Sequence, residues 1–79
     1  MYREIFTERI KKARNNIGFT QKEVSNETGI AYSKIAKIET GAQNADIETI
    51  GTLAEFYNIS IDWLFGLGRK ENDHKMTIN

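Results

Sequence analysis

Apolar side chains recur at helical spacing near the start of the chain, at intervals of three or four residues. The repeat consists of Tyr2, Phe6, Ile10, Ala13 and Ile17. Such spacing lines up one apolar stripe on an amphipathic helix, and Gly18 follows it as a natural C-terminal stop. The pattern therefore predicts a first helix that ends just before Gly18.

A second short helix is predicted directly after Phe19. Thr20 and Glu23 have the T-x-x-E spacing of a capping box, in which each side chain bonds the backbone N–H of the other residue. Phe19 and Val24 occupy the positions of the hydrophobic staple that often accompanies this box. Gly29, which readily adopts the left-handed conformation that closes helices, marks the end.

The third predicted helix carries Ile30, Ile35 and Ile38 as its apolar stripe and stops at Gly41. Isolated helices shorter than about 12–15 residues are marginal in water. The second and third helices must therefore be held by a larger core, and the tight joint between them at Gly29 must matter.

Two further helices follow a polar, turn-prone GAQNA stretch. Asp46 is a suitable N-cap for the fourth helix and Ser60 for the fifth, while Asn58 can take the left-handed conformation between them. Inward positions are expected at Ile47, Ile50, Leu53, Ala54, Tyr57, Ile61, Leu64 and Phe65. The whole pattern predicts an all-α domain of five helices over residues 1–68 and a polar, flexible tail over residues 69–79.

Composition narrows the classes of protein that this domain can be. The 79 residues contain no cysteine, which leaves no disulfide or zinc–thiolate site and favours a reducing cytoplasm. No apolar run approaches the length of about 18 residues that a membrane span needs. The single histidine, His74, lies in the predicted tail, and the acids are dispersed. We therefore expect no catalytic site, no metal site and no cofactor, and we predict that the protein is not an enzyme.

The net charge is zero, but the charges are unevenly divided along the sequence. Residues 1–19 carry five Lys or Arg against two acids, whereas residues 45–68 carry four acids and no Lys or Arg. The basic side chains of the first helix include Arg9, Lys11, Lys12 and Arg14. Such asymmetry suggests one face for a polyanion and another that avoids it.

The outward side of the third helix has the character of a surface that contacts nucleic acid. Its side chains are Tyr32, Ser33, Lys34, Ala36, Lys37 and Thr40. Most are hydrogen-bonding groups, with two lysines and no acid. A helix fits the major groove of B-DNA, where each base pair presents a distinct pattern of donors, acceptors and methyl groups. The preceding helix would then offer its first-turn amides and Gln21 to a phosphate.

Several spaced motifs carry a resemblance to a known family. They are TQ-x-E-V, G-I, I-x-x-I-E-x-G, N-x-x-x-E-T-I and S-I-D-W-L, in this order. With them the sequence resembles the phage-repressor (Cro/CI, or XRE) helix-turn-helix family over about residues 6–66. The resemblance implies a lambda-repressor-like, five-helix domain that binds double-stranded DNA in a sequence-specific manner. It further implies a cytoplasmic transcriptional repressor that binds a palindromic operator as a homodimer.

The resemblance also implies roles for individual residues. The base-reading positions match Tyr32, Ser33, Lys34 and Lys37, and the positions that contact the DNA backbone match Gln21, Thr40, Gln43 and Asn44. A family ion pair between the first and third helices matches Arg14 and Glu39, and its role would be structural. A symmetric dimer would place two third helices about 34 Å apart.

Five positions depart from the family pattern. Among them, Gly51 interrupts the fourth helix at a cost of about 1 kcal/mol relative to Ala, and Ala45 stands where proline is frequent. Ala31 stands where a Ser or Thr N-cap is common, which predicts a cost of roughly 0.5–2 kcal/mol for the third helix. Ser25 and Thr28 replace residues that are typically apolar, which predicts weaker packing of the second helix.

The sequence leaves three alternatives open. Tyr32 can contact DNA or simply cover apolar surface, and Trp63 can complete the core or face a partner subunit. The domain can also be a protein-interaction module, such as an antirepressor or an antitoxin-like protein that sequesters a protein partner through its acidic second half, because fold does not fix function.

Overall fold

The computed structural model describes residues 1–67, so the predicted tail over residues 69–79 lies outside the described residues. The helices of the described part are α1 (Tyr2–Ile17), α2 (Gln21–Thr28), α3 (Tyr32–Thr40), α4 (Ile47–Tyr57) and α5 (Ile61–Leu64). The prediction of an all-α fold with five helices is confirmed for this part of the chain. Across residues 1–67, no helix has the length and apolar character needed to cross a bilayer.

The helix boundaries follow local signals that the sequence carries. The Thr20 hydroxyl accepts from the backbone N–H of Glu23 at 3.1 Å, and the Glu23 carboxylate accepts from the backbone N–H of Thr20 at 2.8 Å, which confirms the capping box. Ser60 caps α5 by accepting from the backbone N–H of Trp63 at 3.0 Å. Gly29 and Asn58 end their helices in the left-handed conformation, with φ of 81° and 58°.

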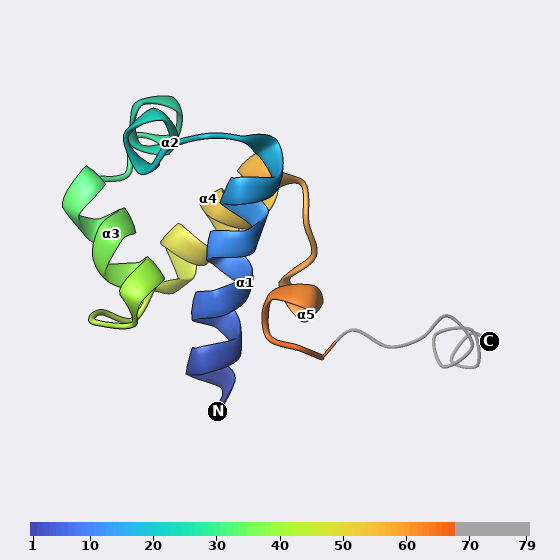
Figure 1. Ribbon diagram of the computed structural model, residues 1–79. Helices are drawn as coiled ribbons and strands as arrows, with labels where there is room; N and C mark the ends of the chain where they lie inside the picture. The colour runs from blue at the N-terminus through green and yellow to red at the C-terminus, as the bar shows by residue number, and fades with distance from the viewer. Residues whose placement is uncertain (68–79) are drawn as a thin grey trace.

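Helix α1 lies at the centre of the fold, with the α2–α3 pair on one side of it and α5 on the other (Figure 1). Every helix contributes a fully buried side chain to one shared core. These side chains are Ile10 of α1, Val24 of α2, Ile35 and Ile38 of α3, Leu53 of α4 and Leu64 of α5. Since neither α2 nor α3 is long enough to be stable alone, this common core is what holds the two short helices.

Aromatic rings extend the core at two ends. Phe6 stacks on Phe65 with ring centroids 5.1 Å apart, and Phe19 meets the edge of Phe56 at 5.7 Å. Trp63 is partly buried, and the Arg9 guanidinium lies over its ring at 5.0 Å from the centroid. Trp63 therefore packs against α1 as a neighbour of the core.

Several positions of the predicted apolar stripes are exposed. Tyr2 is 56% exposed and Ile17 is 43% exposed, at the two ends of α1. Ile47 is 86% exposed and Ile61 is 47% exposed. Each is the first residue of its helix, where the apolar stripe runs past the surface that the neighbouring helices cover. Ile30 likewise precedes α3 and does not belong to it, although it is partly buried against the core.

The three arginines of α1 bond backbone carbonyls near the ends of helices. Arg3 donates to the carbonyl of Gly41 at 2.6 Å, and Arg9 donates to the carbonyl of Trp63 at 2.7 Å. Arg14 donates to the carbonyl of Phe19 at 2.8 Å. Gly41 and Trp63 lie at the C-terminal ends of α3 and α5, where carbonyls carry partial negative charge that guanidinium groups stabilise, whereas Phe19 lies in the connection between α1 and α2. Much of the positive charge predicted for a polyanion is thus used inside the fold.

We expect the substitution of a buried isoleucine to lower stability far more than the same substitution of an exposed isoleucine. Ile10→Ala should lower the free energy of unfolding by about 2–5 kcal/mol, because it leaves a cavity at the centre of the core. The matched change Ile47→Ala should alter it by no more than about 0.5 kcal/mol, because that side chain is almost fully exposed. Urea unfolding followed by circular dichroism measures both, and equal losses would contradict the described packing.

Candidate nucleic-acid interface

Helix α3 presents one face to the core and the opposite face to solvent. Ile35 and Ile38 point inward and are buried, whereas Ser33, Lys37 and Thr40 are exposed. At about 100° of rotation per residue, these three exposed side chains share one side of the helix. The structure therefore brings most of the predicted DNA-contacting residues of α3 into one outward stripe.

Tyr32 lies at the first turn of α3 and is 54% exposed. It borders a shallow surface pocket at the N-terminus of α2. The pocket is lined by Arg14, Phe19, Thr20, Gln21, Lys22 and Tyr32. The start of α2 and the start of α3 thus meet at one hollow in which amide and basic groups gather.

Two hydroxyl groups fasten the turn between α2 and α3. Ser25 donates to the carbonyl of Ile30 at 2.6 Å, and Thr28 donates to the carbonyl of Val24 at 2.7 Å. The Thr28 hydroxyl also accepts from the backbone N–H of Ile30 at 3.2 Å. The prediction that Ser25 and Thr28 only weaken α2 is therefore incomplete, because both polar groups satisfy backbone atoms of the joint.

Helix α3 lacks the side-chain cap that the family pattern usually supplies. Ala31 occupies the N-cap position and makes no side-chain hydrogen bond there, as its identity predicts. In place of a cap, the hydrogen bonds of Ser25 and Thr28 in the preceding turn position the start of α3.

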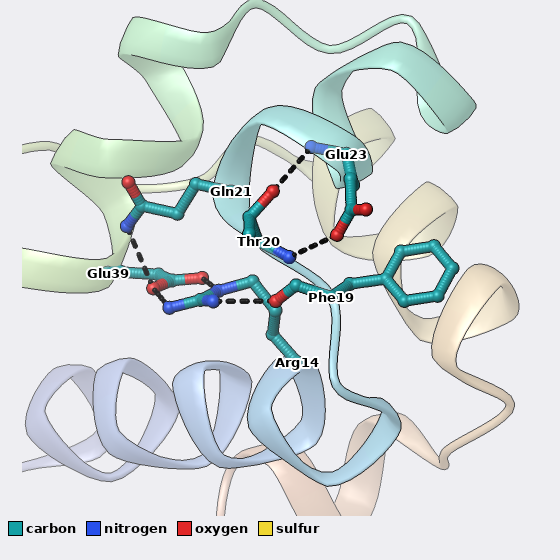
Figure 2. A network of polar contacts seen from close by, with 6 residues as sticks. All are labelled: Arg14, Phe19, Thr20, Gln21, Glu23 and Glu39. Carbon is teal, nitrogen blue, oxygen red and sulfur yellow. Dashed lines mark hydrogen bonds and ion pairs between the residues drawn. The ribbon is translucent and has the colours of Figure 1, made fainter.

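The far end of α3 is held by a buried ion pair with α1 (Figure 2). Arg14 donates from Nε to Glu39 Oε2 at 2.7 Å and from Nη2 to Glu39 Oε1 at 2.9 Å. Glu39 is 4% exposed, and its hydrogen bond raises the pKa of Arg14 above the ordinary value. The structure thus joins the two residues for which the sequence suggested a structural pair.

Gln21 takes part in the same network, which the sequence did not predict. Its Nε2 donates to Glu39 Oε1 at 3.0 Å, so the carboxylate links α1, α2 and α3 (Figure 2). A buried carboxylate has about four lone-pair sites, and one arginine does not fill them. The sequence carried no signal for this contact, because the burial of Glu39 is known only from the structure.

Lys34 has a partner that the sequence did not indicate either. Its Nζ lies 3.1 Å from Oδ1 of Asp46, in the loop that leads into α4. Asp46 does occupy the N-cap position of α4, but its carboxylate makes no cap hydrogen bond to the backbone, which corrects the expected capping role. The Thr49 hydroxyl and then the Lys34 ammonium lower the pKa of Asp46 to about 2. Of the four predicted base-reading side chains, Lys34 is the one tied to another part of the fold.

The remaining predicted backbone contacts lie around the end of α3. The Thr40 hydroxyl donates to the carbonyl of Lys37 at 3.1 Å and accepts from the backbone N–H of Ala42 at 3.4 Å. Gln43 and Asn44 follow in the loop and are exposed. Predicted phosphate contacts therefore flank α3 at both of its ends.

A metal site is not formed by the described residues. Within residues 1–67 no three His, Asp or Glu side chains come together in a way that could hold an ion. The chemistry offered by this surface is hydrogen bonding and positive charge.

Comparison with known proteins agrees with this geometry. Residues 7–67 match the family model described as a helix-turn-helix domain. The chain is 34% identical over 58 residues to the HTH-type transcriptional regulator ImmR of Bacillus subtilis (strain 168), covering 73% of this chain and 46% of the relative. It is 32% identical over 60 residues to the SPbeta prophage-derived uncharacterized HTH-type transcriptional regulator YonR of the same organism, covering 76% of this chain and 56% of the relative. The chain thus spans about half the length of these relatives, and no solved structure matches it.

We expect Glu39→Gln to destabilise the fold by about 3 kcal/mol, because the change leaves the largely buried Arg14 without a counter-charge. Glu55→Gln is the matched control, since Glu55 is exposed on α4 and should change stability by less than about 0.5 kcal/mol. Thermal and urea unfolding of the two variants give the comparison. Similar stabilities would mean that the buried pair does not hold the three helices together.

The lowered pKa of Asp46 predicts a specific dependence on pH. Its pKa falls from 3.8 to about 2 on folding, so the carboxylate stabilises the folded state fully above pH 3.8 and loses this effect as the pH falls through 2. An NMR titration of the carboxyl carbon should give a pKa of about 2. Lys34→Met should raise that pKa, with the Thr49 hydroxyl still keeping it below the ordinary value. A wild-type carboxyl that titrates at its ordinary value would contradict the described contacts.

Proposed function

The chain belongs to the helix-turn-helix domain family, and from this membership we propose that it is a transcriptional regulator that binds double-stranded DNA in a sequence-specific manner. In this proposal α3 enters the major groove and α2 lies across the backbone. The observation that carries it is the outward stripe of Ser33, Lys37 and Thr40 on a helix that is fastened at both ends.

The proposed base contacts come from the first two turns of α3. A serine hydroxyl such as that of Ser33 donates or accepts at a base edge, and the ammonium of Lys37 suits the O6 and N7 acceptors of guanine. Tyr32 offers a phenol at the edge of the same face. Lys34 joins this set when its ammonium leaves Asp46.

The proposed backbone contacts lie on either side of the base-reading face. At the start of α2, the surface pocket combines free first-turn amides with Lys22 and Gln21, groups that suit a phosphate. Gln21 uses one amide proton on Glu39 and keeps the second for a DNA oxygen. Thr40, Gln43 and Asn44 would meet the backbone on the far side of the groove.

Dimerisation is part of the proposal because a single domain has little free positive charge. The formal charge of the chain is zero, and Arg3, Arg9 and Arg14 bond groups within the fold. Phosphate neutralisation supplies much of the affinity of DNA-binding proteins. A symmetric homodimer doubles these contacts and matches a palindromic operator with half-sites about 34 Å apart.

We further propose that the protein acts in the cytoplasm as a repressor. A dimer seated in adjacent major grooves would physically block other proteins from the same DNA. The prophage origin printed for one relative fits a regulator of a mobile element. The proposal assigns the chain a binding role and no reaction.

Selection from a pool of random duplexes tests the proposal directly. At near-physiological salt, the wild type should enrich an inverted repeat. Lys37→Ala should bind that site about 1–3 kcal/mol more weakly and lose discrimination at one base position of each half-site. Lys12→Ala removes the same charge from the exposed side of α1 and should leave the enriched sequence unchanged.

The same selection distinguishes the alternative function. A protein that is folded by circular dichroism but enriches no sequence would contradict DNA reading. It would favour a module that sequesters a protein partner through the acidic surface of residues 45–68.

A further inference from the structure

Lys34 is placed differently from the other predicted base-reading side chains. Lys37 and Ser33 are exposed, whereas the side chain of Lys34 is 31% exposed and its ammonium contacts Asp46. On the helix, Lys34 lies about 100° beyond Ser33, on the side of α3 that turns toward the start of α4. The fold therefore directs this lysine to a carboxylate beside the proposed DNA surface.

Asp46 is held in place for this contact. Its backbone is the N-cap of α4, and Thr49, a residue of the first turn of α4 that is 5% exposed, contributes most to lowering the pKa of its carboxyl group. The carboxylate offers the ammonium an anionic oxygen, as a DNA phosphate does. In the free protein, Lys34 thus contacts a carboxylate, whose anionic oxygen resembles that of the DNA phosphate proposed as its ligand.

We propose that Asp46 competes with DNA for Lys34 and so lowers the affinity of the protein for every duplex that takes up the Lys34 contact. This inference rests on the proposed function. A duplex gains the Lys34 contact only by leaving Asp46 without its cation near the phosphates. Every complex that uses Lys34 carries this cost, whereas a duplex that leaves the contact between Lys34 and Asp46 intact does not.

The competition has a measurable size and sign. Ion pairs on a surface are weak and are screened by salt, so removing the competitor should raise affinity for a random-sequence duplex by about 5-fold at low salt. One additional phosphate contact should also steepen the slope of log K against log salt by about 0.9. The gain on the selected operator should be at least as large, because the operator complex uses the Lys34 contact fully and the variant no longer has to release Lys34 from Asp46.

Asp46→Asn is a suitable variant because asparagine is as good an N-cap as aspartate, which preserves the start of α4. Fluorescence anisotropy with a random-sequence duplex and with the selected operator would compare wild type, Asp46→Asn, Lys34→Met and the double variant. Glu48→Gln is the matched control, since it removes one exposed negative charge from the same end of α4 without touching the ion pair. Circular dichroism checks that every variant is folded.

The expected result is a gain for Asp46→Asn on the random duplex that vanishes in the Lys34→Met background, with little change for Glu48→Gln. A gain of equal size in the Lys34→Met background, or with Glu48→Gln, would overturn the inference, because simple repulsion of phosphates would then explain it. No gain at all from Asp46→Asn, in a wild type that binds its operator, would overturn it and leave the proposed function intact. Folded wild type and Asp46→Asn that bind no duplex would overturn both.

Discussion

The buried carboxylate of Glu39 is the contact on which the arrangement of the first three helices depends. It receives two hydrogen bonds from Arg14 and one from Gln21, so a single side chain on α3 fixes the distances to α1 and α2. Burying a charge is costly unless it is paired and hydrogen-bonded, and here the several donors meet that requirement. The apolar core alone would resist sliding of two such short helices less specifically than this directional network does.

This use of charge limits how the surface can bind DNA. The arginines of α1 bond carbonyls or carboxylates of the fold, so positive charge that the sequence appeared to offer to a polyanion is structural. In the proposed complex, affinity would then come from the placement of a few side chains and from the proposed second subunit, and less from a general basic surface.

The sequence was sufficient to predict helix starts and ends wherever the contacts that determine them are local. The Thr20–Glu23 box, the stops at Gly29 and Asn58 and the Ser60 cap involve neighbours within a few residues, and the structure has them as predicted. It was insufficient where the partner lies far along the chain. Asp46 was assigned to the backbone of its own helix but bonds Lys34, and Ile47 followed the stripe but extends beyond any covering helix. Periodicity reports which way a residue faces, not whether another element reaches it.

The two ends of α3 are held by different chemistry, and this difference bears on recognition. At the start, the hydroxyls of Ser25 and Thr28 satisfy backbone atoms of the turn, while at the end Glu39 joins three helices. Neither set of contacts involves the outward stripe of Ser33, Lys37 and Thr40. A rigidly held helix can therefore present these side chains for the proposed contacts with bases. Lys34 differs from these because its contact with DNA requires an exchange of partners. The affinity of this surface for DNA would therefore depend partly on a contact that the free protein already makes between Lys34 and Asp46.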